Sequence, residues 1–179
     1  DSKSELGFYK TVKTVSYEYL KDISNQTLSN DYLIEKYGHL RPNTYNLESD
    51  CYYKMGIVRN QTAFNEINNL DDPDILSWQK NKKIFLEETS KLLEINSTSL
   101  LESNLYQAVD SRERIKFEFS KYLSASMELI AIWGQKNSFS REQLSYLSIS
   151  NFKEVINSTY TRENINSFFD SEIKRNKRI

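Results

Sequence analysis

The chain is 179 residues long, which is the size of one domain with at most a short appendage. Its formal net charge of −1 gives no electrostatic reason to expect a nucleic acid or an anionic membrane as a partner. No apolar run approaches the ~20 residues that a membrane helix needs. One cysteine excludes an internal disulfide and a metal–thiolate cluster, and it indicates a reducing, cytoplasmic compartment.

The first half of the chain predicts two helices followed by a long loop. Apolar residues at three- and four-residue steps predict a helix over residues 4–24, and a second helix ends at Tyr37. Residues 46–60 hold no period and are expected to form a loop with a short turn, and residues 61–70 one or two helical turns. With four glycines and two prolines in the whole chain, we expect an all-α fold. It would be an irregular multi-helix bundle, with this long loop between the second helix and the helix that begins near residue 72.

A strong start signal opens that next helix. Residues 71–74 supply a capping Asp, a proline at the first helical position, and acid in the first turn, where the helix dipole favours it. The helix is predicted to end near Ile95. The side chains expected to face inward are Ile75, Trp78, Ile84 or Phe85, Leu92 and Leu93.

Two further helices are expected before residue 137. Ser97 or Thr98 caps one that continues to Ala108, and the longest helix of the chain covers residues 110–136. One broad stripe of this longest helix is predicted to be buried: Ile115, Phe119, Tyr122, Leu123, Ser126, Leu129, Ile130 and Trp133.

Three shorter helices are expected to close the chain. Ser140, with Gln143 three residues later, forms a capping box that starts a helix ending at Leu147. The caps of the last two helices are expected at Ser150 or Asn151 and at Thr161.

The loop after the second helix gathers polar side chains around the only histidine of the chain. Gly38 and Pro42 each break a helix, and the loop carries an imidazole, a guanidinium, a hydroxyl and a phenol. The guanidinium could bind a phosphate or a carboxylate, and the imidazole could donate to an anion or transfer a proton. Alternatively, the imidazole caps the preceding helix and the guanidinium pairs with a structural carboxylate. The candidate substrate-binding residues are His39, Arg41, Thr44 and Tyr45.

A second candidate lies on the polar edge of the longest helix. Arg112, Lys116 and Ser120 follow one another at four-residue steps and share a face. If this row lies close to the histidine loop, its basic side chains would add a cationic patch for a phosphorylated partner. The alternative is a solvated face with Glu113 and Glu118 as partners. The sequence has no Gly-rich phosphate loop and no paired histidines, so we expect no catalytic residue and no metal site.

Two segments carry a resemblance to a known family. The run KYGHLRPNTYN at residues 36–46 resembles "KYGHLRPGTYD" of the phosphoenolpyruvate synthase-like, PEP-utilising phosphotransferases, which include rifampicin phosphotransferases. Residues 112–124, continuing to residues 140–147, are similar to that family's "RE-x-x-KF-x-FTKxLS" and "SREDLSYL". A shorter match covers residues 14–22, so the resemblance extends over roughly residues 10–150 in order and spacing.

The resemblance implies a domain of a larger enzyme. Both segments look like the helical middle domain, which binds the acceptor between an ATP-grasp domain and a swivelling domain with a phosphorylated histidine. Residues 1–179 would then be a single helical domain, a fragment that is not catalytic alone and holds no cofactor. ATP and Mg are expected for the full-length enzyme, and the other two domains of the same chain are the expected partners. The acceptor is a small molecule or a glycan-type compound.

The chain departs from the family pattern at two places. Asn43 stands where the family has Gly, although Asn tolerates a positive φ better than most residues. Where the family continues "SPRYDE", this chain has SDCYYK at residues 49–54, which puts the identity of the acceptor in doubt. The alternative function is a helical protein-interaction module without an enzymatic role.

Overall fold

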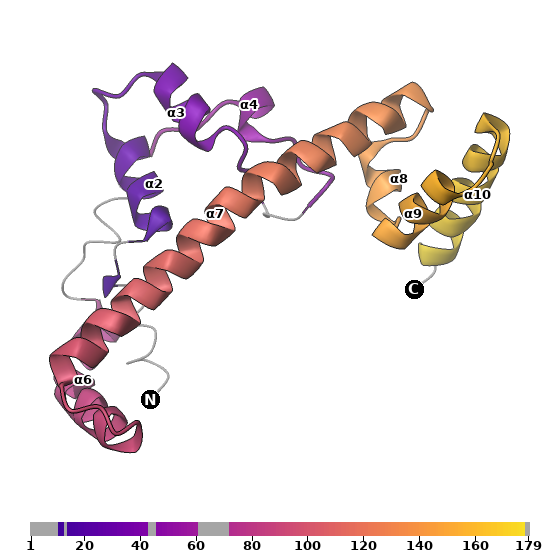
Figure 1. Cartoon of the computed structure of the whole chain (residues 1–179). Coiled ribbons are helices and arrows are strands. Elements are labelled where there is room, and N and C mark those ends of the chain that lie inside the picture. The colour runs from indigo at the N-terminus through magenta and orange to yellow at the C-terminus, as the bar shows by residue number, and fades with distance from the viewer. Residues whose placement is uncertain (1–10, 13, 43–45, 61–71, 178–179) are drawn as a thin grey trace. The chain divides into compact units, whose positions relative to one another are not determined.

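The computed structural model describes residues 11–12, 14–42, 46–60 and 72–177 (Figure 1). In this part of the chain every regular element is a helix, and there is no strand. The all-α, multi-helix fold expected from the sequence is therefore confirmed. None of the helices formed by the described residues has the length and apolar character needed to cross a membrane.

The residues group into two compact units. Unit 1 comprises residues 1–37 and 57–119, and unit 2 comprises residues 38–56 and 120–179. The long helix α7, Thr98–Lys136, supplies residues to both units. The candidate residues on the histidine loop belong to unit 2, whereas Arg112 and Lys116 belong to unit 1.

In unit 1, helices α2 (Val15–Ser24) and α3 (Asn30–Tyr37) pack around a buried tyrosine. The ring of Tyr37 meets that of Tyr19 edge-on at 5.0 Å, and its hydroxyl donates a 2.8 Å hydrogen bond to Asp22. The helix predicted over residues 4–24 is interrupted at Thr14, which is extended and precedes the start of helix α2 at Val15. Residues 4–10 and 13 of that prediction lie outside the described residues.

Helix α6 (Pro73–Leu92) begins as the sequence predicts, because Asp72 accepts a hydrogen bond from the backbone N–H of Asp74. Its buried face begins correctly with Ile75 and Trp78. The prediction for the second half of α6 is wrong, because the buried apolar side chain there is Leu86. The side chains predicted to face inward that are exposed are Ile84, Phe85, Leu92 and Leu93.

Helix α7 is continuous over 39 residues, so the two helices predicted for this region are one. Asp110, where we placed the boundary, instead pairs with Arg114 one turn later at 2.8 Å, which supports an uninterrupted helix. Much of the predicted buried stripe faces solvent. Its exposed members are Ile115, Phe119, Tyr122, Ser126 and Leu129.

The core of unit 2 is an apolar cluster against which its C-terminal helices pack: α8 (Arg141–Ser145), α9 (Ile149–Asn157) and α10 (Arg162–Asn176). We call it the phenylalanine cluster: Phe139, Leu144, Phe169 and Ile173, packed against Trp133 at the end of α7. It fixes how α8, α9 and α10 pack within the unit.

The caps of these helices are mostly those that the sequence predicts. Ser140 and Gln143 form the expected capping box of α8, and Thr161 caps α10. The cap of α9 is Ser148, which forms a second capping box with Asn151, so the predicted cap at Ser150 or Asn151 is wrong. Asn151 lies three residues after Ser148, and its side-chain oxygen accepts a hydrogen bond from the backbone N–H of Ser148.

Candidate functional site

The histidine loop is held in unit 2 by a one-turn helix, α4 (Tyr52–Met55). The backbone N–H of Tyr52 donates to the carbonyl of Leu40, and that of Tyr53 donates to the carbonyl of Gly38, both at 2.8 Å. These two bonds join the segment that follows helix α3 to the start of α4. The segment that carries His39 and Arg41 therefore has a defined backbone.

His39 is buried against α7. Its Nε2 lies 3.1 Å from the hydroxyl of Ser120. One of the two groups donates to the other, according to which imidazole nitrogen carries the proton. This contact joins the segment of residues 36–46 to the segment of residues 112–124.

Arg41 is also buried, with 5% of its surface exposed, and its guanidinium faces inward. One terminal nitrogen donates to the hydroxyl of Ser124 at 2.7 Å and lies 3.3 Å from a carboxylate oxygen of Glu128. The other donates to the backbone carbonyls of Ser49 at 3.1 Å and Asn46 at 3.4 Å. These contacts match the structural alternative for Arg41, an ion pair with a carboxylate of the same chain.

Glu128 is the centre of a cluster of charges that we call the Glu128 network: Arg41, Asp50, Lys54, Glu128 and Arg141. Its second carboxylate oxygen lies 2.6 Å from the Lys54 ammonium and 2.7 Å from the Arg141 guanidinium. Asp50 also pairs with Arg141, at 2.7 Å. Three cations thus share two carboxylates, so each charge in the network has an opposite charge beside it.

The protonation of this network follows from its geometry. Burial alone would raise the pKa of Glu128, but the hydrogen bonds from Lys54 and Arg141 outweigh it and hold that pKa below its ordinary value. The bond to Glu128 in turn raises the pKa of Lys54. The carboxylate and the ammonium are therefore both charged at neutral pH.

The Glu128 network also holds the segment that follows the histidine loop. Arg141 donates to the carbonyl of Leu47 at 3.0 Å, next to the carbonyls of Asn46 and Ser49 that Arg41 binds. Two guanidinium groups thus bind three of the four carbonyls between residues 46 and 49. The network positions this short segment, which we call the Leu47 segment.

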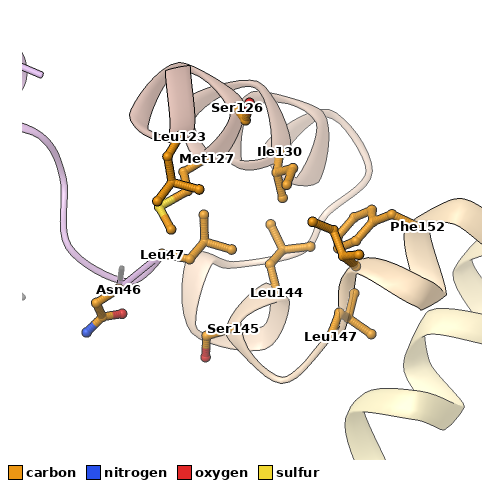
Figure 2. A pocket seen from close by; sticks show the side chains of 11 residues that line it. Asn46, Leu47, Leu123, Ser126, Met127, Ile130, Leu144, Ser145, Leu147 and Phe152 are labelled. Atoms are coloured by element: carbon orange, nitrogen blue, oxygen red, sulfur yellow. The ribbon is translucent and has the colours of Figure 1, made fainter. Parts of the chain in front are cut away.

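The Leu47 segment forms one wall of a pocket in unit 2 with a volume of about 730 Å³ (Figure 2). The other walls come from helices α7 and α8 and from the start of α9. None of the side chains that line it is charged. They are Asn46, Leu47, Leu123, Ser126, Met127, Ile130, Leu144, Ser145, Leu147, Ile149 and Phe152.

The remaining predicted site residues fall elsewhere. Arg112 and Lys116 both pair with Glu113, at 3.2 and 3.1 Å, as the alternative interpretation of that helix face expects. Thr44 and Tyr45 lie outside the described residues. In the described part of the chain no cluster of histidine, cysteine or carboxylate side chains could hold a metal ion.

Sequence reasoning missed Glu128 and Lys54, and it recognised Arg141 only as part of a capping box. One signal was available for Glu128. Ser120, Ser124 and Glu128 follow at four-residue steps and thus share a face of α7, two hydroxyls and a carboxylate in one row. Such a row can form hydrogen bonds with an imidazole and an ion pair with a guanidinium that lie beside it.

The chain was compared with known protein families, with curated proteins and with solved structures, and none of the three comparisons found a match.

Proposed function

We propose that this chain is the acceptor-binding helical domain of an ATP- or PEP-dependent phosphotransferase of the phosphohistidine type, and that it is not catalytic alone. The observation that supports the proposal is the pairing of the two resembling segments. His39 meets Ser120 at 3.1 Å and Arg41 meets Ser124 at 2.7 Å. Two segments that resemble motifs of one family, and that lie about eighty residues apart in the chain, thus contact each other.

In this proposal Arg41 acts by positioning. Its two terminal nitrogens bind protein acceptors, so Arg41 holds the Leu47 segment beside the pocket and does not bind a phosphate itself. The domain would present an acceptor, a small molecule or a glycan-type compound, to a phosphorylated histidine of the swivelling domain. ATP and Mg would bind in the ATP-grasp domain of the same chain.

Phosphorylation of the full-length protein that contains this chain tests the proposal. The protein is incubated with Mg and with ATP labelled at the β- or the γ-phosphate, or with labelled PEP. We expect a protein-bound phosphoryl group that is stable in base and labile in acid, as phosphohistidine is. Residues 1–179 alone should acquire no label. A full-length protein that takes up no label from either donor would contradict the proposal.

The second candidate is a non-enzymatic interaction module. It is favoured by the exposed apolar side chains of α7, of which Tyr122 and Leu129 in unit 2 are 74% and 68% exposed. Large apolar groups on a helix surface are typical of faces that another protein covers. This candidate predicts that Tyr122→Ser and Leu129→Ser abolish a protein complex while labelling is absent throughout.

A further inference from the structure

We propose that the pocket of unit 2 is a binding site for a small, neutral and largely apolar molecule. The inference goes beyond the phosphotransferase proposal and does not need it, because it rests only on the shape, lining and support of this pocket. Its volume of about 730 Å³ falls within the range of roughly 300–1,000 Å³ that is usual for sites of drug-sized ligands.

The inner surface of the pocket is apolar. Side chains from the Leu47 segment and from α7, α8 and α9 point toward one space (Figure 2). Met127 is among them, and its flexible thioether adapts to ligands of different outline. The other apolar side chains that converge there are Leu47, Leu123, Ile130, Leu144 and Phe152.

Three side-chain oxygens of the lining form hydrogen bonds within the protein. The hydroxyl of Ser126 donates to the carbonyl of Tyr122 at 2.9 Å, and that of Ser145 donates to the carbonyl of Glu142 at 2.7 Å. The side-chain oxygen of Asn46 accepts from the N–H of Glu48 at 2.8 Å. A ligand rich in hydrogen-bonding groups would leave many of them unpaired here, which favours an apolar ligand.

The absence of charge in the lining favours a neutral ligand. Arg41 and Arg141, which bind the Leu47 segment, both lie against Glu128 at 3.3 and 2.7 Å. An anionic ligand would have to compete with that carboxylate, and a cationic ligand would find no unpaired acid in the lining. Burial of apolar surface is then the main source of affinity.

The wall formed by the Leu47 segment is fixed before any ligand arrives. Arg141 binds the carbonyl of Leu47 itself, and Arg41 binds the carbonyls on either side of it, at Asn46 and Ser49. A preformed wall lowers the conformational cost of binding. The Glu128 network thus has a positioning role in this site, and it does not touch the ligand.

The two methionines of the chain provide the test. Met127 lines the pocket, whereas Met55 lies outside the lining and is 56% exposed. The protein is labelled with ¹³C in the methionine methyl groups and titrated with 1-naphthol, a neutral aromatic probe. We expect the Met127 resonance to shift in a saturable manner and the Met55 resonance to stay in place. Met55→Leu assigns the two resonances.

A matched pair of variants shows whether the probe is in the pocket. Ser126 lines it and the neighbouring Ala125 does not, and both side chains are exposed on α7. Ser126→Trp fills the pocket and should weaken the binding of 1-naphthol about tenfold or more, whereas Ala125→Trp should leave the affinity unchanged. If Ser126→Trp does not fold, Ser126→Leu, which adds less volume, is measured in the same way.

Three results would overturn the proposal. Met127 could fail to respond to 1-naphthol in the folded protein, or the two tryptophan variants could weaken binding equally. The Met127 resonance could also shift with protein concentration in the absence of the probe, which would show that a second copy of the chain covers the pocket.

Discussion

The phenylalanine cluster and the Glu128 network lie in the same unit but act by different physics. The cluster is made of side chains that contact one another through apolar surface, with the rings of Phe169 and Trp133 at 5.3 Å. Its attraction is non-directional and carries no charge. The network consists of hydrogen bonds and ion pairs with fixed directions, and it ends on three backbone carbonyls.

The difference indicates a division of roles within unit 2. The cluster supplies most of the free energy that keeps helices α8, α9 and α10 packed, because burial of large apolar side chains dominates stability. The network contributes less net free energy, since desolvation of its charges offsets much of their attraction. What it supplies is one conformation of the Leu47 segment, and with it one wall of the pocket.

Truncation within the cluster should have the largest effect. Phe169 has no exposed surface and contacts the rings of Trp133, Phe139 and Phe152. Phe169→Ala should lower the free energy of unfolding by about 3–5 kcal/mol, measured by urea denaturation. The exposed Ile156 on α9 serves as the control, and Ile156→Ala should change stability by less than about 0.5 kcal/mol. Equal effects of the two changes would show that this cluster is not the core.

Removal of one partner from the Glu128 network should cost less. Arg41→Met should lower the free energy of unfolding by about 2–3 kcal/mol, because it leaves several acceptors without their donor. Arg41 and Glu128 lie 3.3 Å apart, so Arg41→Met and Glu128→Gln together should cost less than the sum of the single changes. Strict additivity in this double-mutant cycle would mean that the two side chains do not interact in solution.

Replacement of Gly134 by alanine distinguishes helix propensity from packing, because the two predict opposite changes in stability. Gly134 lies in the last turn of α7, and alanine at a helical position ordinarily stabilises the helix by up to about 1 kcal/mol relative to glycine. Here the added Cβ would lie 2.3 Å from Cδ1 of the buried Leu144 and 3.2 Å from the carbonyl of Phe139. Gly134→Ala should therefore destabilise unit 2 by about 1–3 kcal/mol in thermal unfolding. Stabilisation would mean that α8 does not pack closely here.

Low pH should weaken the stabilisation that the Glu128 network provides and leave that of the phenylalanine cluster unchanged. The pKa of Glu128 is lower in the folded protein than the value of about 4.3 expected for the unfolded chain. Its stabilisation is therefore present above that pH and is lost as pH falls through the folded pKa. Glu128→Gln should reduce the loss of stability between neutral and strongly acidic pH, as followed by urea denaturation at a series of pH values. An unchanged pH profile would contradict the pKa shift of this carboxyl.

Local signals in the sequence were enough for most helix starts. Asp72, Ser140 and Thr161 cap their helices as predicted, because each binds a backbone N–H only two or three residues away. Apolar periodicity was less informative. It tells which side chains share a face, but not whether another element covers that face, so Tyr122 and Leu129 were wrongly placed in the core.

The partners of the predicted site residues could not be read in the same way. A carboxylate was expected beside Arg41 in one interpretation, but Glu128 lies 87 residues further along the chain. Many carboxylates are equally far away in sequence, and only the packing of α7 in unit 2 selects this one. The pocket has a similar origin, because its lining comes from four segments that no local pattern connects.

The central claim is that the Glu128 network holds the Leu47 segment against helix α7. The nuclear Overhauser effect between the methyl groups of Leu47 and Met127, which line the same pocket (Figure 2), tests it directly in protein labelled at leucine and methionine methyl groups. We predict a strong effect in the unaltered protein and a marked weakening in Arg41→Met. An effect that is absent in the folded, unaltered protein, or that is equally strong in folded Arg41→Met, would contradict the claim.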